Sequence, residues 1–287
     1  MKPSMNRTSK IYVVLLMLFL YMPIFVLILF SFNENKSRSV WTGFSLHWYR
    51  ELFSDQLIMT SLKNTLIIAV VASVIALVLG TAAALGIYSM RSRWFKSVLM
   101  NITYMPILNP EIVTGVSLLL LFVFGMDAAA KVNGLLGFHL LPELGLGLGT
   151  LIIAHVTFCT PYVILNVLPK LRQMDRFVYE AALDLGCSPA LAFFKVVIPE
   201  IMPGMMTGFL MALTYSIDDF VISYFVSSAT TQTLPVTIGA MVRRRISPKI
   251  NALSAIIFVV VLSILILYNL YSVRKEKQLK KGGESFR

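Results

Sequence analysis

Three acidic side chains lie within long apolar stretches of the sequence: Glu111, Asp218 and Asp219. A charged residue in a membrane-spanning helix costs roughly 2.5–3.5 kcal/mol at the bilayer centre on insertion scales, so it normally faces a cavity or a partner charge. Adjacent residues on a helix point about 100° apart, so Asp218 and Asp219 would need two separate partners in lipid. We therefore expect both acids to face a wide lumen; an internal salt bridge or a bond to another subunit is the alternative.

Glu111 follows a sequence that interrupts helices. Pro106, Asn109 and Pro110 precede it within an otherwise apolar segment, and prolines in a helix interior cause a kink or a break. Non-helical backbone at membrane depth is tolerated only where it is buried in protein or lines a cavity. The sequence therefore predicts a break beside Glu111 and makes this acid a candidate pathway residue. The alternative is a carboxylate that caps the helix resuming after the break.

No pattern for nucleotide binding, metal binding or hydrolysis occurs in the sequence. The P-loop spacing G-x-x-x-x-G-K-[ST] is absent, and His47, His139 and His155 are isolated. We expect His155, which lies inside an apolar stretch, to be packed and hydrogen-bonded. Cys159 and Cys187 are expected to be small buried hydrophobes. The sequence thus predicts a non-enzyme with no catalytic residue, no metal site and no cofactor of its own.

The composition points to a membrane protein. The 287 residues are 57% hydrophobic and 14% charged, whereas soluble domains average roughly 45–50% and about 25%. The mean hydropathy is +0.79, yet the net charge is +11. These values exclude a soluble single-core enzyme, a disordered chain and a disulfide scaffold. They also exclude a nucleic-acid-binding protein, because the apolar content leaves no basic face.

Six stretches reach the length of about 20 apolar residues that a spanning helix needs. The first is interpreted as a retained anchor, since its apolar run exceeds the 7–15 residues of a signal-peptide core. The sequence therefore predicts an all-α, polytopic membrane protein with six transmembrane helices, over residues 11–30, 66–88, 98–124, 147–168, 201–226 and 252–271.

The loop charges predict the orientation. With the N-terminus inside, sixteen of the 25 Lys and Arg residues fall on the cytoplasmic side, as the positive-inside rule requires. Both termini are then cytoplasmic. The cluster Arg243, Arg244 and Arg245 remains outside in this topology; it is expected either to dock a partner protein or to contact lipid headgroups.

The segment 169–200 is the most patterned loop. Its apolar residues recur at helical spacing, and Asp175 and Gly186 are placed to cap and to end a first short helix. Ser188 is placed to cap a second short helix, which Pro199 is expected to stop. We expect two short helices that form a rigid cytoplasmic surface.

The run Glu180-Ala181-Ala182, followed by Gly186 and then Ile198-Pro199, resembles the EAA signature of ABC-importer permease subunits. Ile198 stands where the family usually has Leu. In that family the loop docks into a groove on an ATPase subunit, so the resemblance implies a type I ABC-importer permease fold. It also implies an ATPase-coupling surface formed by Glu180, Ala181, Ala182, Gly186, Ile198 and Pro199.

A more specific resemblance extends over nearly the whole chain. In order, the matching segments resemble the spermidine/putrescine permeases of the PotC type, and they are 21–23, 31–33, 109–113, 155–159, 216–221 and 247–253. The resemblance implies a binding-protein-dependent importer of polyamines in the bacterial inner membrane. It implies as partners a second permease subunit in a heterodimer, a pair of ATP-binding subunits that hold the ATP, and an extracytoplasmic solute-binding protein. The alternatives are an ABC permease for another cationic or metal-complexed solute, and a proton-coupled secondary transporter.

The pathway candidates follow from this implied substrate. Carboxylates pair with ammonium groups, and an aromatic ring attracts a cation. Tyr215 lies on the same side of its helix as the two aspartates, and Ser216 adds a hydroxyl group. Trp48 is expected at the outer mouth, or else in an interfacial aromatic belt. The substrate pathway is therefore expected to contain Asp218, Asp219, Glu111, Tyr215, Ser216 and Trp48.

The expected domain organisation has three parts. Residues 1–61 form an N-terminal transmembrane helix and an external loop, and residues 62–272 form a permease core of five transmembrane helices that contains the coupling loop 169–200. Residues 273–287 form a basic cytoplasmic tail.

Overall fold

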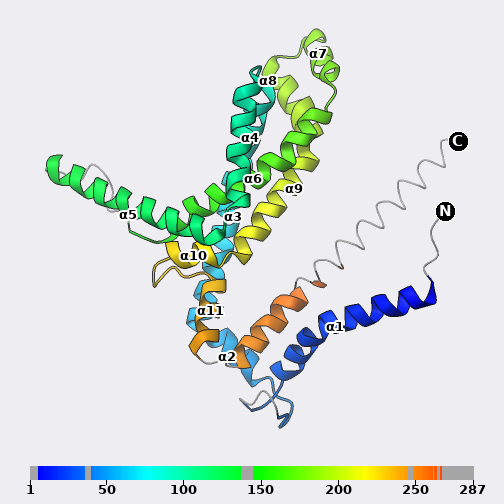
Figure 1. Ribbon diagram of the computed structural model, residues 1–287, viewed down its shortest axis with the longest axis vertical. Coiled ribbons are helices and arrows are strands. Elements are labelled where there is room, and N and C mark those ends of the chain that lie inside the picture. The colour runs from blue at the N-terminus through cyan, green and yellow to red at the C-terminus, as the bar shows by residue number, and fades with distance from the viewer. Residues whose placement is uncertain are drawn as a thin grey trace. The chain divides into compact units, whose positions relative to one another are not determined.

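The computed structural model describes residues 6–35, 40–136, 145–244, 248–260, 262–263 and 266. Helices joined by short connections make up this part of the chain (Figure 1), which confirms the predicted all-α fold. The described residues divide into two compact units. The segments up to Ile58 and from Ala240 onward form one unit, and Met59–Gly239 forms the other.

The first unit contains α1 (Arg7–Ser31), α2 (His47–Ser54) and the apolar helix Pro248–Val260. Trp48 of α2 is only 4% exposed. Its indole Nε1 donates a hydrogen bond of 2.7 Å to the backbone oxygen of Asn33, which satisfies the polar end of a buried aromatic side chain. Trp48 is therefore a packing residue of this unit and does not stand on an open rim.

An ion cluster joins α2 to the helix Pro248–Val260. Lys249 Nζ lies 2.7 Å from Glu51 Oε1 and 3.3 Å from Asp55 Oδ2, and the lysine side chain is 18% exposed. Burial alone lowers the pKa of Lys249, but the hydrogen bonds and charges of the two carboxylates outweigh it and hold the pKa above its usual value. The cluster therefore stabilises the charged lysine in the folded unit.

The second unit contains the remaining helices, of which the first residues of α3 and the last residues of α11 belong to the first unit. They are α3 (Gln56–Ser89), α4 (Arg93–Leu108), α5 (Glu111–Leu136), α6 (Leu148–Gln173), α7 (Arg176–Asp184), α8 (Pro189–Ala192), the π-helical turn Phe193–Val197, α9 (Ile198–Asp218), α10 (Val221–Val226) and α11 (Leu234–Arg244).

Helices α6 and α9 lie side by side along most of their length (Figure 1). Small residues recur every fourth position along the buried stripe of α9: Gly204, Gly208, Ala212 and Ser216. A Cβ atom added at Gly204 would lie 2.7 Å from the backbone oxygen of Asn166 in α6. Small residues at this spacing let two helices approach closely in a membrane, so α6 and α9 form a closely packed pair.

Two of the predicted spans are interrupted. The stretch 98–124 divides into α4 and α5, because Pro110 cannot continue a helix. The predicted break beside Glu111 is thus confirmed, although Pro106 lies within α4. The stretch 201–226 divides after Asp218, where Asp219 and Phe220 separate α9 from α10.

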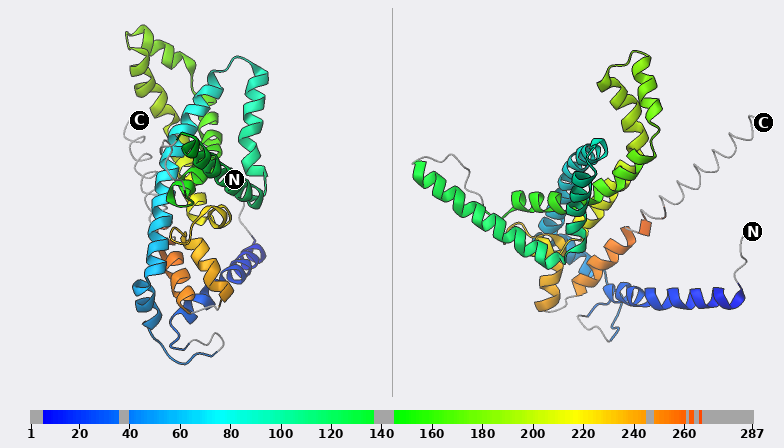
Figure 2. Two further views of the ribbon diagram at one scale, coloured as in Figure 1. Left: turned by 90° about the vertical axis from the view of Figure 1, so that its left-hand side faces the viewer. Right: turned by 45° about the horizontal axis from the view of Figure 1, so that its top comes forward.

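The loop 169–200 forms two short helices with the predicted caps. Asp175 accepts a hydrogen bond of 3.0 Å from the backbone N–H of Phe177, and Ser188 accepts one of 3.3 Å from Leu191. Gly186 ends α7 with a φ of 87°, a left-handed conformation that favours glycine. Both views of Figure 2 place this pair of helices together at the ends of α6 and α9.

Pro199 does not stop the second short helix, and that prediction was wrong. Helical structure continues from Pro189 to Asp218 as one apolar segment of 30 residues. A π-helical turn over Phe193–Val197 directly precedes α9, and the N–H of its C-cap Ile198 bonds to Phe193 O. This wider turn changes the hydrogen-bond pattern just before the proline, and Pro199 then occupies the first turn of α9, where its missing N–H costs little.

Five helices of the described chain are long and apolar enough to cross a membrane: Thr8–Ser31, Gln56–Ser89, Glu111–Leu135, Leu148–Gln173 and Pro189–Asp218. The sixth predicted span, 252–271, lies only partly among the described residues, where it forms the apolar helix Pro248–Val260. The predicted basic tail 273–287 lies outside them.

Candidate functional site

The two helix breaks of the second unit line one cavity of about 220 Å³. The α4–α5 break contributes Glu111, and the α9–α10 break contributes Asp218 and Asp219. Helices α6 and α9 supply an aromatic wall. The residues that line the cavity are Pro106, Glu111, Thr114, Phe158, Tyr162, Tyr215, Asp218, Asp219, Phe220 and Ile222. None of these described lining residues is basic, so the cavity gathers three acids without a lysine or arginine.

The two aspartates differ in their surroundings. Asp219 is 8% exposed, and its carboxylate accepts hydrogen bonds of 3.2 Å from the N–H of Ile222 and 2.7 Å from the N–H of Ser223. It therefore caps the short helix α10. Asp218, the last residue of α9, is exposed. The expectation that both acids face a lumen equally is thus refined: both line the cavity, but the Asp219 carboxylate is bound to backbone N–H groups.

Glu111 is the first residue of α5, directly after Pro110. Its side chain is exposed and its carboxylate lies in the first turn, where the helix dipole favours a negative charge. Glu111 lines the cavity and also lies at the start of a helix. The two alternatives from the sequence, a pathway residue and a carboxylate at a helix start, therefore apply to the same side chain.

The aromatic wall consists mainly of a stacked tyrosine pair. The rings of Tyr162 and Tyr215 have centroids 4.3 Å apart and planes inclined by 22°. Tyr162 and Phe158 line the cavity beside Tyr215, and sequence reasoning missed both. Their spacing along α6 is that of one helix face, and this was the available signal. It did not show which other helix that face would meet.

Ser216 does not line the cavity. It is 2% exposed, and its Oγ lies 2.7 Å from Nδ1 of His155 in α6. The other ring nitrogen of His155, Nε2, lies 3.1 Å from Oγ of Ser223 in α10. The expectation that His155 is packed and hydrogen-bonded is confirmed, since the residue is 0% exposed. Cys159 is buried as expected, whereas Cys187 is only half-buried.

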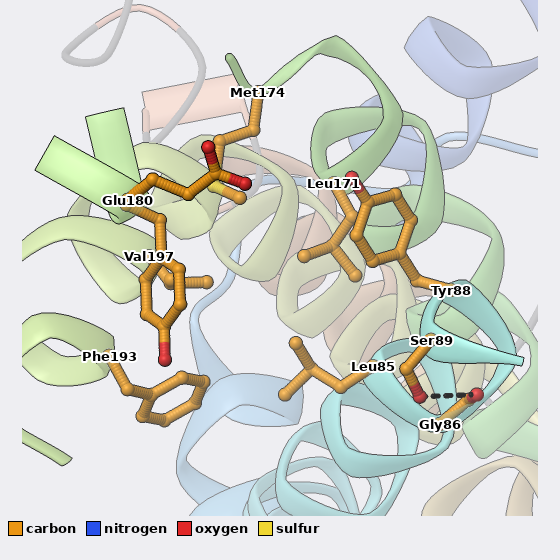
Figure 3. A pocket seen from close by; sticks show the side chains of 10 residues that line it. Leu85, Gly86, Tyr88, Ser89, Leu171, Met174, Glu180, Phe193 and Val197 are labelled. Carbon is orange, nitrogen blue, oxygen red and sulfur yellow. Dashed lines mark hydrogen bonds between the residues drawn. The ribbon is translucent and has the colours of Figure 1, made fainter. Parts of the chain in front are cut away.

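A second cavity of about 500 Å³ lies at the other end of α6, beside the loop 169–200 (Figure 3). Its wall is mostly apolar, and Glu180 is its one charged lining residue. The Glu180 carboxylate lies near Met174 in Figure 3. Glu180 therefore faces a cavity of its own chain. The lining residues are Leu85, Gly86, Tyr88, Ser89, Leu171, Met174, Tyr179, Glu180, Phe193 and Val197.

Large apolar side chains are exposed around this second cavity. Phe177 is 76% exposed, Leu185 86% and Phe194 66%. The two alanines of the signature differ in exposure: Ala181 is exposed and Ala182 is half-buried. Exposed large apolar side chains are typical of a contact with another protein where they lie together in a patch.

The remaining predicted site residues lie elsewhere. Of the residues predicted for the ATPase-coupling surface, Ile198 is half-buried and Pro199 is exposed. Arg243 and Arg244 belong to the last turn of α11, and Arg243 is exposed. The side chain of Arg244 and the whole of Arg245 lie outside the described residues.

Comparison with known proteins decides the family. Residues 76–277 match the family of binding-protein-dependent transport system inner membrane components. The chain belongs to this family. It is therefore a multi-pass membrane protein of a transport system and not an enzyme, as the sequence predicted.

Curated relatives cover most of this permease. It is 40% identical over 220 residues to the putrescine transport system permease protein PotI of Escherichia coli (strain K12), a match that covers 76% of this chain and 74% of the relative. It is 33% identical over 230 residues to the spermidine/putrescine transport system permease protein PotC of Haemophilus influenzae, with coverage of 80% and 82%.

Solved structures share the fold. A bacterial ABC transporter involved in the import of the acidic polysaccharide alginate matches with a TM-score of 0.64 at 18% identity, over 94% of this chain and 99% of that chain. A bacterial alginate ABC transporter in complex with an alginate-bound periplasmic protein matches with a TM-score of 0.65 at 16% identity, over 90% and 89%. These matches confirm the ABC-importer permease fold.

Proposed function

We propose that this permease carries polyamines such as putrescine or spermidine through the cavity at the two helix breaks. The observation that carries the proposal is the grouping of Glu111, Asp218 and Asp219 with a stacked tyrosine pair and with no basic residue among the described lining. The relatives named above are putrescine and spermidine/putrescine permeases, which supports the same substrate class.

The chemistry of the cavity suits a chain with an ammonium group at each end. Asp218 and Glu111 are exposed carboxylates on opposite helix breaks, so each can pair with one ammonium group. The faces of Tyr162 and Tyr215 attract a cation and cover the methylene groups between the charges. Asp219 adds negative potential while its oxygens cap α10.

The energy comes from a partner in this proposal. A pair of ATP-binding subunits holds the ATP, and one of them docks on the surface formed by α7 and α8. The exposed Phe177, Leu185 and Phe194 and the signature residues around Gly186 supply the contact. Because α6 and α9 are closely packed between this surface and the cavity, a movement imposed at the loop is transmitted to Asp218.

The proposal also includes the remaining partners and the orientation. Both termini are cytoplasmic, and a second permease subunit completes the pathway as a heterodimer. An extracytoplasmic solute-binding protein delivers the polyamine, and the cluster Arg243–Arg245 docks it through acidic groups on its surface.

Uptake of radiolabelled putrescine tests the proposed function. The permease is expressed with its partner subunits in cells that lack their own polyamine importers. Loss of a charge-assisted hydrogen bond of about 1.5–3 kcal/mol lowers binding by roughly 10- to 150-fold, so Asp218→Asn and Glu111→Gln should reduce uptake at low putrescine at least tenfold. Asp127→Asn is the matched control, because Asp127 is an exposed acid on α5 that pairs with Lys131.

Two results would contradict the proposal. One is unchanged putrescine uptake in Asp218→Asn and Glu111→Gln cells that contain normal amounts of the complex. The other is an importer that takes up a different cationic or metal-complexed solute and no putrescine.

A further inference from the structure

A buried hydrogen-bond chain crosses the break between α9 and α10. Ser216 lies near the end of α9, Ser223 lies in α10, and His155 of α6 lies between them at 0% exposure. His155 Nδ1 is 2.7 Å from Ser216 Oγ, and Nε2 is 3.1 Å from Ser223 Oγ. One imidazole ring therefore holds both sides of the interruption.

The donors and acceptors of this chain match in either tautomer of the ring. A neutral imidazole has one donor and one acceptor nitrogen, so one serine hydroxyl donates to His155 and the other accepts from it. His155 Nε2 also lies 3.6 Å from Oδ2 of Asp219, the oxygen that accepts the N–H of Ser223 at 2.7 Å. Ser223, at one end of the chain, thus also donates its backbone N–H to the carboxylate that caps α10.

Asp218 lies at the edge of this break. It is the last residue of α9, and Asp219 has an extended backbone with φ −65° and ψ 118°. A helix that continued through Asp219 would move the Asp219 carboxylate and the start of α10, which line the cavity together with Asp218. The Phe220 ring packs closely on Gly239 of α11, since a Cβ atom added at Gly239 would lie only 2.5 Å from it. This contact limits how far the backbone at the break can move.

We propose that His155 is a positioning residue that fixes the α9–α10 break and thereby holds the Asp218 carboxylate at the cavity. His155 is not among the residues that line the cavity, so it acts through Ser216, Ser223 and Asp219. The proposal rests on the proposed function only for its transport readout.

A geometric readout tests the positioning without any assumption about the substrate. Asp218→Cys is introduced into a Cys187→Ser background, in which the remaining native thiol, Cys159, is buried. The rate at which a small cationic methanethiosulfonate modifies residue 218 is then measured in the assembled transporter, with and without His155→Leu. We expect His155→Leu to change this rate by roughly tenfold, as loss of a contact of this strength implies. Equal rates would overturn the proposal.

The transport readout is a double-mutant cycle. His155→Leu should raise the putrescine concentration for half-maximal uptake about tenfold in the wild-type background and add nothing in the Asp218→Asn background. Equal additional losses in both backgrounds would overturn the proposal. If wild-type cells take up no putrescine, the proposed function fails, whereas the thiol rates still decide the positioning.

Two further variants separate positioning from general packing. Cys159→Ala is the matched control, because its Sγ contacts Ala212 O at 3.3 Å in the same α6–α9 contact and takes no part in the hydrogen-bond chain. It should leave both readouts unchanged. Ser223→Ala removes only the α10 side of the chain and should reproduce the effect of His155→Leu, including where the leucine variant fails to accumulate. No effect of Ser223→Ala on the rate at residue 218 would overturn the proposal.

Discussion

Replacement of Gly204 by alanine tests the close packing of α6 and α9. The added Cβ atom would lie 2.7 Å from the backbone oxygen of Asn166 and 2.7 Å from Cγ of Lys170. Real Cβ contacts this short essentially do not occur. The lysine side chain can move, but the carbonyl oxygen is fixed in α6, so α9 must move away from its neighbour.

The expected cost follows from overpacking. Extra methyl groups in a well-packed region cost about 1–3 kcal/mol, while alanine gains about 1 kcal/mol over glycine from helix propensity. Gly125→Ala in α5 is the matched control, because nothing lies within 4 Å of its added Cβ atom and it receives the propensity gain alone. The free energy of unfolding of Gly204→Ala should therefore lie about 1–3 kcal/mol below that of Gly125→Ala.

Reversible unfolding in mixed detergent micelles measures this difference. The two variants are purified in parallel, and the helical signal is followed as the denaturing detergent is increased. Equal free energies of unfolding for Gly204→Ala and Gly125→Ala would refute the close contact between α6 and α9 on which the proposed transmission depends.

Three more predictions concern other parts of the chain. Lys249→Gln should lower the thermal stability at neutral pH. Because the pKa of Lys249 is raised in the folded protein, the stability difference from wild type should vanish as the pH rises through that pKa. A stability difference that persists at high pH would contradict this. Gly186→Val forces a branched side chain into a φ of 87°, which costs roughly 1–2 kcal/mol, so protease cleavage of the loop should become faster than in Cys187→Val. Leu185→Glu replaces an apolar side chain that is 86% exposed and should weaken co-purification of the ATPase subunit at least severalfold, whereas Asp184→Asn at the adjacent end of α7 should not.

The sequence predicted features that depend on local chemistry. Asp175, Ser188 and Gly186 are caps whose side chains or backbone act within a few residues, so composition and spacing were sufficient. The break beside Glu111 was predicted for the same reason, because Pro110 removes a backbone donor wherever it stands.

Features that depend on distant contacts could not be predicted in this way. Tyr162 stacks on Tyr215 because α6 and α9 are neighbours, and no local pattern specifies that pairing. The different surroundings of Asp218 and Asp219 depend on a break after α9 that contains no proline. Pro199 misled the sequence reasoning, because the π-helical turn before it preserved a continuous helix.

Protection of a cavity residue by substrate tests the central claim most directly. Thr114 of α5 lines the acidic cavity, so Thr114→Cys in the Cys187→Ser background reports on its occupancy. In the reconstituted transporter with its partner subunits, saturating putrescine should slow modification of this thiol by a cationic methanethiosulfonate severalfold and leave an Asp127→Cys control unchanged. Equal rates with and without putrescine at residue 114 would contradict the claim that this cavity holds the transported polyamine.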